Sequence, residues 1–96
     1  MTLRFTPRAR DDLRQIMEYI AKENPTAADR VGRAIFDTAT LIVRRPYLGI
    51  RNAKDAKFRS RLVTRYPYRI HYFVEDADIW IVHIRHSARR PLDEPI

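Results

Sequence analysis

Cysteine is absent from the 96 residues of the sequence, so the chain can form neither a disulfide nor a thiolate metal site. Glycine is scarce too, with two residues, and no apolar run approaches the length of a membrane-spanning helix. The amino terminus also lacks the long apolar stretch of a signal peptide. We therefore expect a cytoplasmic protein that does not enter a membrane and that forms a single domain over residues 1–96.

Acidic residues are few in the second half of the chain. Between Arg44 and Arg90 the sequence has 12 Lys and Arg against 4 Asp and Glu, and this segment accounts for the net charge of +7. A surface of this charge attracts phosphate backbones or an acidic protein partner through its long-range field. The alternative is an ordinary solvated surface without a partner, and the charge alone fits both interpretations.

Motifs of the common enzyme classes are missing. The sequence has neither the G-x-x-x-x-G-K-[ST] loop of nucleotide-binding proteins nor the G-x-S-x-G turn of serine hydrolases. Its three histidines, His71, His83 and His86, do not have the spacing of a metal site, and acidic residues near them are few. The paired carboxylates Asp11 and Asp12 are interpreted as partners of a helix dipole. We therefore predict neither a bound metal nor a cofactor.

Two amphipathic helices are predicted in the first half of the chain. Thr6-Pro7 is typical of a helix start, and apolar residues at three- and four-residue steps then continue to about Ala21. Asn24-Pro25 ends this helix and begins a second one, whose apolar stripe stops before Pro46. Two such helices joined by a short turn form an antiparallel hairpin.

The second half is rich in β-branched and aromatic residues. A polar loop runs from Pro46 to Asp55, and short turns separate the apolar runs that follow it. With a short run at the amino terminus, these predict four strands, at Leu3–Phe5, Phe58–Val63, Tyr68–Val74 and Ile79–Arg85. The predicted fold class is therefore α+β, in the order β-α-α-β-β-β, with a helical hairpin packed on one face of a small twisted antiparallel β-sheet.

Strand alternation assigns the basic side chains to a face of this sheet. Because the helices cover one face only, we expect the opposite face to carry Arg59, Arg61 and Arg69 beside aromatic and histidine side chains. Guanidinium groups bind phosphates in a bidentate manner, and imidazole transfers protons near neutral pH. The alternative is that each arginine pairs with a surface carboxylate. In the last strand the same rule separates Trp80, Val82 and Ile84 from Ile79, Ile81, His83 and Arg85.

Several short motifs occur in a fixed order along nearly the whole chain. They include Phe5-Thr6-Pro7-Arg8-Ala9, Asn24-Pro25 followed by Ala27-Ala28, Tyr68-Arg69-Ile70-His71-Tyr72, and Ile84-Arg85-His86. In these motifs the sequence resembles the RelE/ParE toxin superfamily of bacterial type II toxin–antitoxin systems, whose fold agrees with the one predicted above. The resemblance implies a small toxin that a cognate antitoxin neutralises by folding a segment across it, which gives a toxin–antitoxin hetero-oligomer.

Two activities occur among the proteins that the sequence resembles. ParE-like members inhibit DNA gyrase by trapping cleaved DNA and pair with ParD-like antitoxins, whereas RelE-like members are endoribonucleases that cut mRNA on the ribosome. The long paired helices predicted here resemble the ParE-like branch, which we favour. The tyrosine that RelE-like chains place near the carboxyl terminus for proton transfer is missing, and His86 is the candidate for its role.

The resemblance also implies particular site residues. For a RelE-like nuclease, the candidate catalytic residues are Arg69, His86 and Arg89. The basic patch that would meet phosphates or an acidic partner comprises Arg59, Arg61, Arg69, Arg85, Arg89 and Arg90. The expected antitoxin contacts are Leu13, Met17, Tyr19, Ile20 and Arg69.

Overall fold

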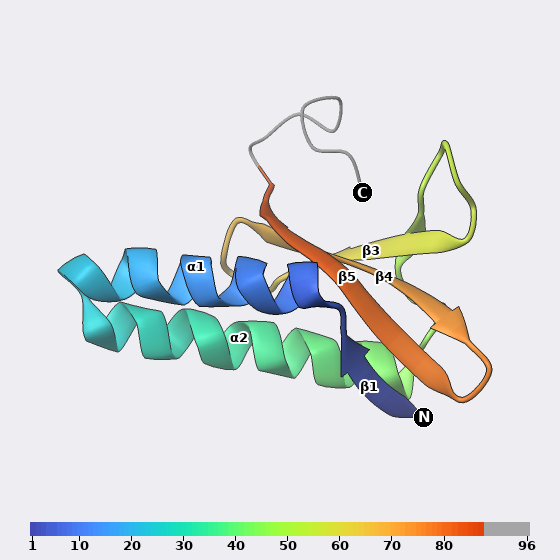
Figure 1. Ribbon diagram of the computed structural model, residues 1–96, viewed down its shortest axis with the longest axis horizontal. Helices are drawn as coiled ribbons and strands as arrows, with labels where there is room; N and C mark the ends of the chain where they lie inside the picture. The colour runs from blue at the N-terminus through green and yellow to red at the C-terminus, as the bar shows by residue number, and fades with distance from the viewer. Residues whose placement is uncertain (88–96) are drawn as a thin grey trace.

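The computed structural model describes residues 1–87 and confirms the predicted α+β fold (Figure 1). Two antiparallel helices lie side by side and pack against a five-stranded sheet. In chain order the elements are β1 (Thr2–Phe5), α1 (Pro7–Glu23), α2 (Pro25–Arg44), β2 (Ile50–Arg51), β3 (Phe58–Leu62), β4 (Tyr68–Glu75) and β5 (Asp78–His86). Within the described residues, no helix is both long and apolar enough to cross a membrane.

A single residue, Asn24, both ends α1 and begins α2. Its backbone N–H donates to the carbonyl of Ile20, and its side-chain carbonyl accepts from the N–H of Ala27 (3.0 Å). Thr6 caps the start of α1 in the same way by accepting from the N–H of Ala9 (3.2 Å). Each cap satisfies a backbone donor that the first helical turn leaves unpaired, typically worth about 1 kcal/mol. The short connection makes the two helices antiparallel, as predicted.

The sheet is mixed rather than wholly antiparallel. Its strand order is β1-β5-β4-β3-β2, and β1 pairs with β5 in parallel, with Phe5 beside Ile81. Short turns make β3, β4 and β5 antiparallel, as predicted, whereas β1 and β5 are joined through the rest of the chain and are able to run in the same direction. The predicted loop from Pro46 to Asp55 also contributes β2, which pairs with β3.

A β-bulge in β5 overturns the strict alternation predicted for this strand. His71 pairs with His83 and Tyr72 pairs with Ile81, so Val82 is an extra residue without a partner on β4. Before the bulge the side chains of odd-numbered residues of β5 face the core, and after it those of even-numbered residues do so. Ile84 therefore packs in the core together with Ile81, although alternation alone placed the two side chains on opposite faces.

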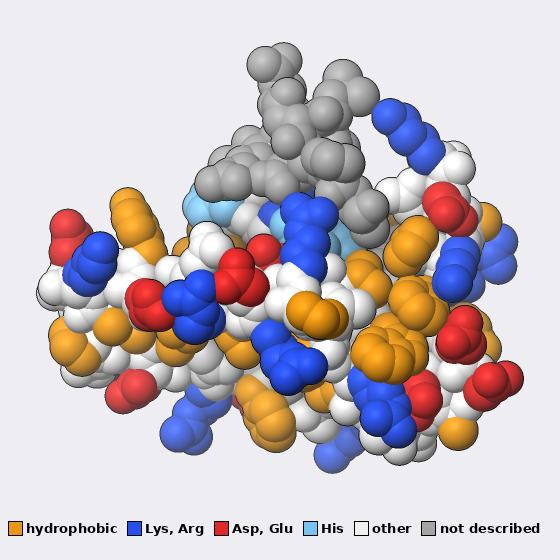
Figure 2. Space-filling model, viewed as in Figure 1, with side chains coloured by type: hydrophobic (Ala, Val, Ile, Leu, Met, Phe, Trp, Pro, Cys, Tyr) orange, Lys and Arg blue, Asp and Glu red, His pale blue; other side chains and the backbone are white. Residues whose placement is uncertain are grey.

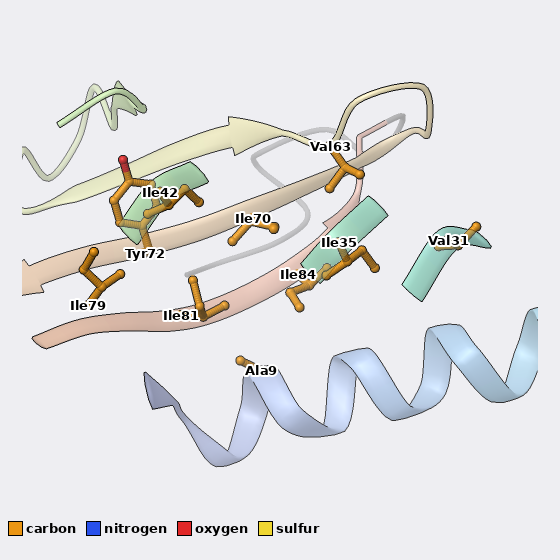
Figure 3. Packing of buried hydrophobic residues seen from close by; sticks show 10 residues of the cluster. All are labelled: Ala9, Val31, Ile35, Ile42, Val63, Ile70, Tyr72, Ile79, Ile81 and Ile84. Atoms are coloured by element: carbon orange, nitrogen blue, oxygen red, sulfur yellow. The ribbon is translucent and has the colours of Figure 1, made fainter. Parts of the chain in front are cut away.

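The core lies between the hairpin and the sheet and is mainly aliphatic (Figure 3). Its buried members are Ala9, Val31, Ile35, Ile42, Val63, Ile70, Tyr72, Ile79, Ile81 and Ile84. The Tyr72 hydroxyl accepts from the N–H of Gly49 (2.9 Å) and donates to the carbonyl of Pro46 (2.8 Å). A Cβ on Gly49 would lie 2.6 Å from this hydroxyl oxygen, so only glycine allows the close approach. These bonds hold the loop after α2 on the sheet.

We expect Tyr72→Phe to destabilise the fold by about 1–3 kcal/mol, because it leaves the buried N–H of Gly49 without an acceptor. Urea unfolding would record the loss as a lower midpoint at unchanged slope. The matched control is Tyr47→Phe, since Tyr47 is 66% exposed. This control should change the free energy of unfolding by less than about 0.5 kcal/mol. Equal losses in the two variants would contradict the role given to the Tyr72 hydroxyl.

Candidate functional site

The sheet face turned away from the core carries a cluster of basic side chains. The pairing register sets Arg69 beside Arg85 and His71 beside His83 across β4 and β5. On β3, Ser60 lies opposite His71. Because residues paired across strands share a face, these side chains form one continuous group. We call Arg69, His71, His83 and Arg85 the open-face cluster.

Arg59 and Arg61 do not belong to this cluster, so the prediction that they share a face with Arg69 is wrong. On β3 they pair with Tyr72 and Ile70, whose side chains enter the core. The physical reason is that alternation separates the two faces within a strand, whereas the pairing register decides how the faces of two strands correspond. The Arg59 guanidinium instead donates to the carbonyl of Gly49 (3.1 Å) and helps to hold the loop before β2.

Asp12 of α1 joins the helix to β5 beside this cluster. Its carboxylate accepts hydrogen bonds from His83 Nδ1–H (2.7 Å) and from the backbone N–H of Ile84 (3.0 Å). With its proton on Nδ1, His83 offers Nε2 as the acceptor for the guanidinium of Arg8 (3.3 Å). β1 pairs with β5 only as far as Ile81, so no strand lies beside Ile84 on this edge. The Asp12 carboxylate therefore takes the place of a strand carbonyl as the acceptor for the backbone N–H of Ile84.

His71 and Arg85 form a second linked pair. Arg85 Nε donates to His71 Nε2 (3.0 Å), and an Arg85 Nη group donates to the carbonyl of His86 (3.3 Å). The rings of His71 and His83 stack with centroids 5.6 Å apart and planes inclined by 22°. Arg85 is only 8% exposed. Its guanidinium is therefore held within the protein surface rather than extended into solvent.

Burial and neighbouring positive charge keep His71 neutral. Desolvation first, and then the charge of Arg85, lower the pKa of His71 from 6.5 to about 4. A neutral imidazole is what the contact with Arg85 requires, because Nε2 accepts there. The pKa of the Arg69 guanidinium is lowered too, by desolvation and then by Arg85, and Arg69 donates to the hydroxyl of Ser60 (2.9 Å). At neutral pH His71 is therefore an acceptor of hydrogen bonds and not an acid.

A groove of about 650 Å³ lies between α1 and the neighbouring ends of β4 and β5. It is lined by charged and aromatic side chains together, namely Arg8, Asp12, Gln15, Ile16, Tyr19, Tyr68, His83, Ile84, Arg85 and His86. Tyr68 packs edge-on against His86 with ring centroids 5.4 Å apart, and burial raises the pKa of its hydroxyl. Such a lining suits a ligand that combines anionic groups with apolar or flat groups.

The solvent side of α1 carries paired charges rather than a cationic patch. Arg14 donates to Glu18 (2.8 Å) and to Asp11, and Gln15 also donates to Asp11 (2.6 Å). The hydrogen bond with Arg14 is the main cause that lowers the pKa of Asp11. Figure 2 shows basic and acidic side chains alternating along this helix. The charges of α1 therefore add little to the net positive charge, in agreement with the charge count.

The predicted antitoxin contacts on α1 fall into two groups. Leu13 and Ile20 pack against the core. Met17 packs on Gly32 of α2, where an added Cβ would lie 2.9 Å from the Met17 methyl group. Tyr19 is 78% exposed and lines the groove. Tyr19 is thus the contact best placed to meet a partner.

Other predicted site residues are only partly brought together. Arg69 and Arg85 are neighbours, and His86 follows Arg85 on β5 and lines the groove. Arg89 and Arg90 lie outside the described residues. Among residues 1–87, no group of three or more His, Asp or Glu side chains is suited to hold a metal ion.

The roles of Arg8 and Asp12 as partners of His83 were missed from the sequence. The two residues are four apart, so they lie on one side of α1. That spacing was the available signal. It gave no indication of a contact with β5, because the partner residue lies 71 positions along the chain from Asp12.

Comparison with known proteins gives the family. Residues 3–91 match the family model of the ParE toxin of the type II toxin–antitoxin system parDE. The chain is 38% identical over 85 residues to Toxin RelE2 of Caulobacter vibrioides. These 85 residues cover 88% of this chain and 93% of the relative. The chromosomal ParDE toxin–antitoxin system of P. aeruginosa has a chain of the same fold, with a TM-score of 0.78, 22% identity and coverage of 90% of this chain and 95% of that one. The isolated RelE toxin of E. coli gives a TM-score of 0.67, 14% identity and coverage of 96% and 89%.

The fold and its matches define a small α+β toxin of the RelE/ParE superfamily. Within that superfamily, the chain belongs to the ParE toxin family of type II toxin–antitoxin systems. The resemblance recognised from the sequence motifs is confirmed.

The lowered pKa of His71 predicts a loss of stability in acid. The unfolded chain binds a proton at His71 below about pH 6.5, whereas the folded chain does so only below about pH 4, so the free energy of unfolding falls across this interval. Both proteins should lose free energy of unfolding when the pH is lowered from about 7 to about 4.5. The loss in His71→Gln should be smaller than the loss in the natural protein, by on the order of 2 kcal/mol. Urea midpoints at both pH values would measure the difference.

The control for this measurement is His86→Gln, because His86 is exposed. It should keep the acid-induced loss of the natural protein. If His71→Gln kept that loss as well, the acid sensitivity would have another origin.

Proposed function

We propose that this protein acts in the cytoplasm as a ParE-like toxin that inhibits DNA gyrase, and that a ParD-like antitoxin neutralises it. The family model that matches most of the chain supports the ParE-like assignment. The net charge of +7 is also favourable for an approach to an enzyme whose substrate is DNA.

The single observation that carries this proposal is the set of hydrogen bonds within the open-face cluster. Phosphodiester cleavage needs cations aimed at the developing charge and a group that exchanges a proton near neutral pH. Here Arg85 donates to His71, Arg69 donates to Ser60, and the pKa of His71 is about 4. A cluster whose His71, His83 and Arg85 are buried and bonded in this way is poorly suited to proton transfer, and this favours a toxin that is not a nuclease.

The groove beside α1 is the surface that we assign to the antitoxin. Tyr19 and Tyr68 give it an aromatic side, and Arg8 and Arg85 give it positive charge. An antitoxin segment with both carboxylates and apolar side chains is complementary to this lining. Such a segment pays an entropic cost when it becomes ordered, so we expect an extended interface and a stable toxin–antitoxin hetero-oligomer.

The alternative is a RelE-like endoribonuclease that cuts mRNA on the ribosome. The relative named Toxin RelE2 favours it, with 38% identity. So does the position of His86 in the groove next to Arg85. In this case Arg69, His86 and Arg89 are the candidate catalytic residues, with the arginines stabilising the phosphate and His86 exchanging the proton.

Two assays run side by side on the purified toxin separate these functions: supercoiling by gyrase, and cleavage of ribosome-bound mRNA. We expect gyrase inhibition with intact mRNA, and we expect Arg69→Ala to leave that inhibition nearly unchanged because Arg69 is bonded within the sheet. Ribosome-dependent cleavage with unaffected gyrase would establish the alternative. Arg69→Ala should then lower the cleavage rate by about 100-fold or more.

The assignment of the antitoxin groove predicts a selective effect of Tyr19. Tyr19→Ala should weaken binding of the cognate antitoxin by about tenfold or more, because it removes an exposed aromatic side chain from the groove. Isothermal titration calorimetry would measure the change. Phe36→Ala is the matched control, since Phe36 is 66% exposed on α2 and does not line the groove. A larger effect of Phe36→Ala would move the antitoxin interface to α2.

A further inference from the structure

A second groove, of about 550 Å³, lies between α2 and the turn that joins β3 to β4. Its lining consists of Arg30, Arg33, Ala34, Asp37, Thr38, Leu41, Thr64, Arg65 and Tyr66. The site described above shares none of these residues. Tyr66 lines the second groove and Tyr68 lines the first, so the β3–β4 turn separates the two.

The charge in this groove is unbalanced. Arg30, Arg33 and Arg65 face a single carboxylate, that of Asp37. Within residues 1–87, the side chains of these three arginines make no hydrogen bond, ion pair or contact with an aromatic ring. This differs from the open-face cluster, whose arginines donate to side chains of the sheet. The guanidinium groups here are available to carboxylates or phosphates from outside.

The floor of the groove is apolar. Ala34 and Leu41 of α2 line it, and both are partly buried. The Thr38 hydroxyl donates to the carbonyl of Ala34 (2.9 Å), so this polar group is already satisfied within the helix. Tyr66 packs against the core and also lines the groove. A ligand that fills the groove would therefore place an apolar group between the cations.

The turn that brings Arg65 to the groove has a strained backbone. Arg65 has a φ of 72°, in the left-handed region that side chains other than glycine rarely adopt. The turn is closed by hydrogen bonds from the N–H of Val63 to the carbonyl of Tyr68 (2.8 Å) and from the N–H of Tyr68 to the carbonyl of Tyr66 (2.9 Å). Glycine or asparagine would fit this position with less strain, yet the chain has arginine there.

We propose that this second groove binds an acidic peptide segment that carries an apolar side chain. Carboxylates of the peptide pair with Arg33 and Arg65, and its apolar side chain rests on the floor near Leu41. A nucleic-acid backbone would meet the same arginines but would leave the apolar floor unused, so the combination favours a peptide. The proposal does not depend on whether the toxin acts on gyrase or on mRNA.

The experiment measures fluorescence anisotropy of a labelled hexapeptide of alternating glutamate and leucine, titrated with the full chain at low ionic strength. We expect the double variant Arg33→Gln/Arg65→Gln to bind about tenfold more weakly, as two ion pairs at a partly exposed site would give. Arg51→Gln is the control, because Arg51 is exposed on β2 and does not line the groove. It should bind like the natural protein. The unfolding midpoint of each variant would show that the fold is retained.

Two altered probes test the chemistry of the ligand. Replacing glutamate by glutamine, or leucine by serine, should each weaken binding about fivefold or more, because either change removes one of the two required groups. Absence of binding by the natural protein would overturn the proposal. An equal effect of Arg51→Gln would do so too, since it would indicate diffuse attraction. Tighter binding of a labelled oligothymidine, dependent on Arg33 and Arg65, would identify the groove as a nucleic-acid site instead.

Discussion

The part of the β5 edge that β1 does not pair with is the constraint on which the arrangement of helices and sheet depends. β1 covers this edge only as far as Ile81, and the bulge at Val82 follows directly. Beyond β1 the edge is satisfied from α1 and its cap: Thr6 Oγ1 donates to the carbonyl of Val82 (3.3 Å), and Asp12 accepts from the N–H of Ile84 (3.0 Å). Leaving these groups buried and unpaired would cost about as much as a lost hydrogen bond for each. The first turns of α1 are thereby fixed on the strand, and α2 follows through its one-residue connection.

The same contact organises the electrostatics of the open face. Asp12 orients His83, the ring of His83 stacks on that of His71, and His71 accepts from Arg85. The neutral imidazole of His71 thus gives the Arg85 guanidinium an acceptor without adding charge. Repulsion between Arg69 and Arg85 is not removed, and it contributes to the lowered pKa of Arg69. The open-face cluster therefore keeps two guanidinium groups close together in spite of their mutual repulsion.

Much of the fold could be predicted because its signals are local. Thr6-Pro7 and Asn24-Pro25 mark both helix starts, and the first helix runs only two residues past the expected Ala21, to Glu23. The errors arose where the answer depends on contacts between distant segments. The two-residue alternation within one strand shows neither that Val82 is an extra residue nor on which face of the sheet Arg59 lies, because both depend on pairing with β4. Asp12 was interpreted as a partner of the helix dipole, because nothing nearby in the sequence indicates a contact with His83.

The sheet ends on the side away from β1 in a strand of two residues, Ile50 and Arg51. So short an edge, with a charged residue in it, offers little backbone for another copy of the chain to pair with. Backbone pairing between two copies of the chain, the first step of fibre-like stacking, is therefore disfavoured along β2 itself.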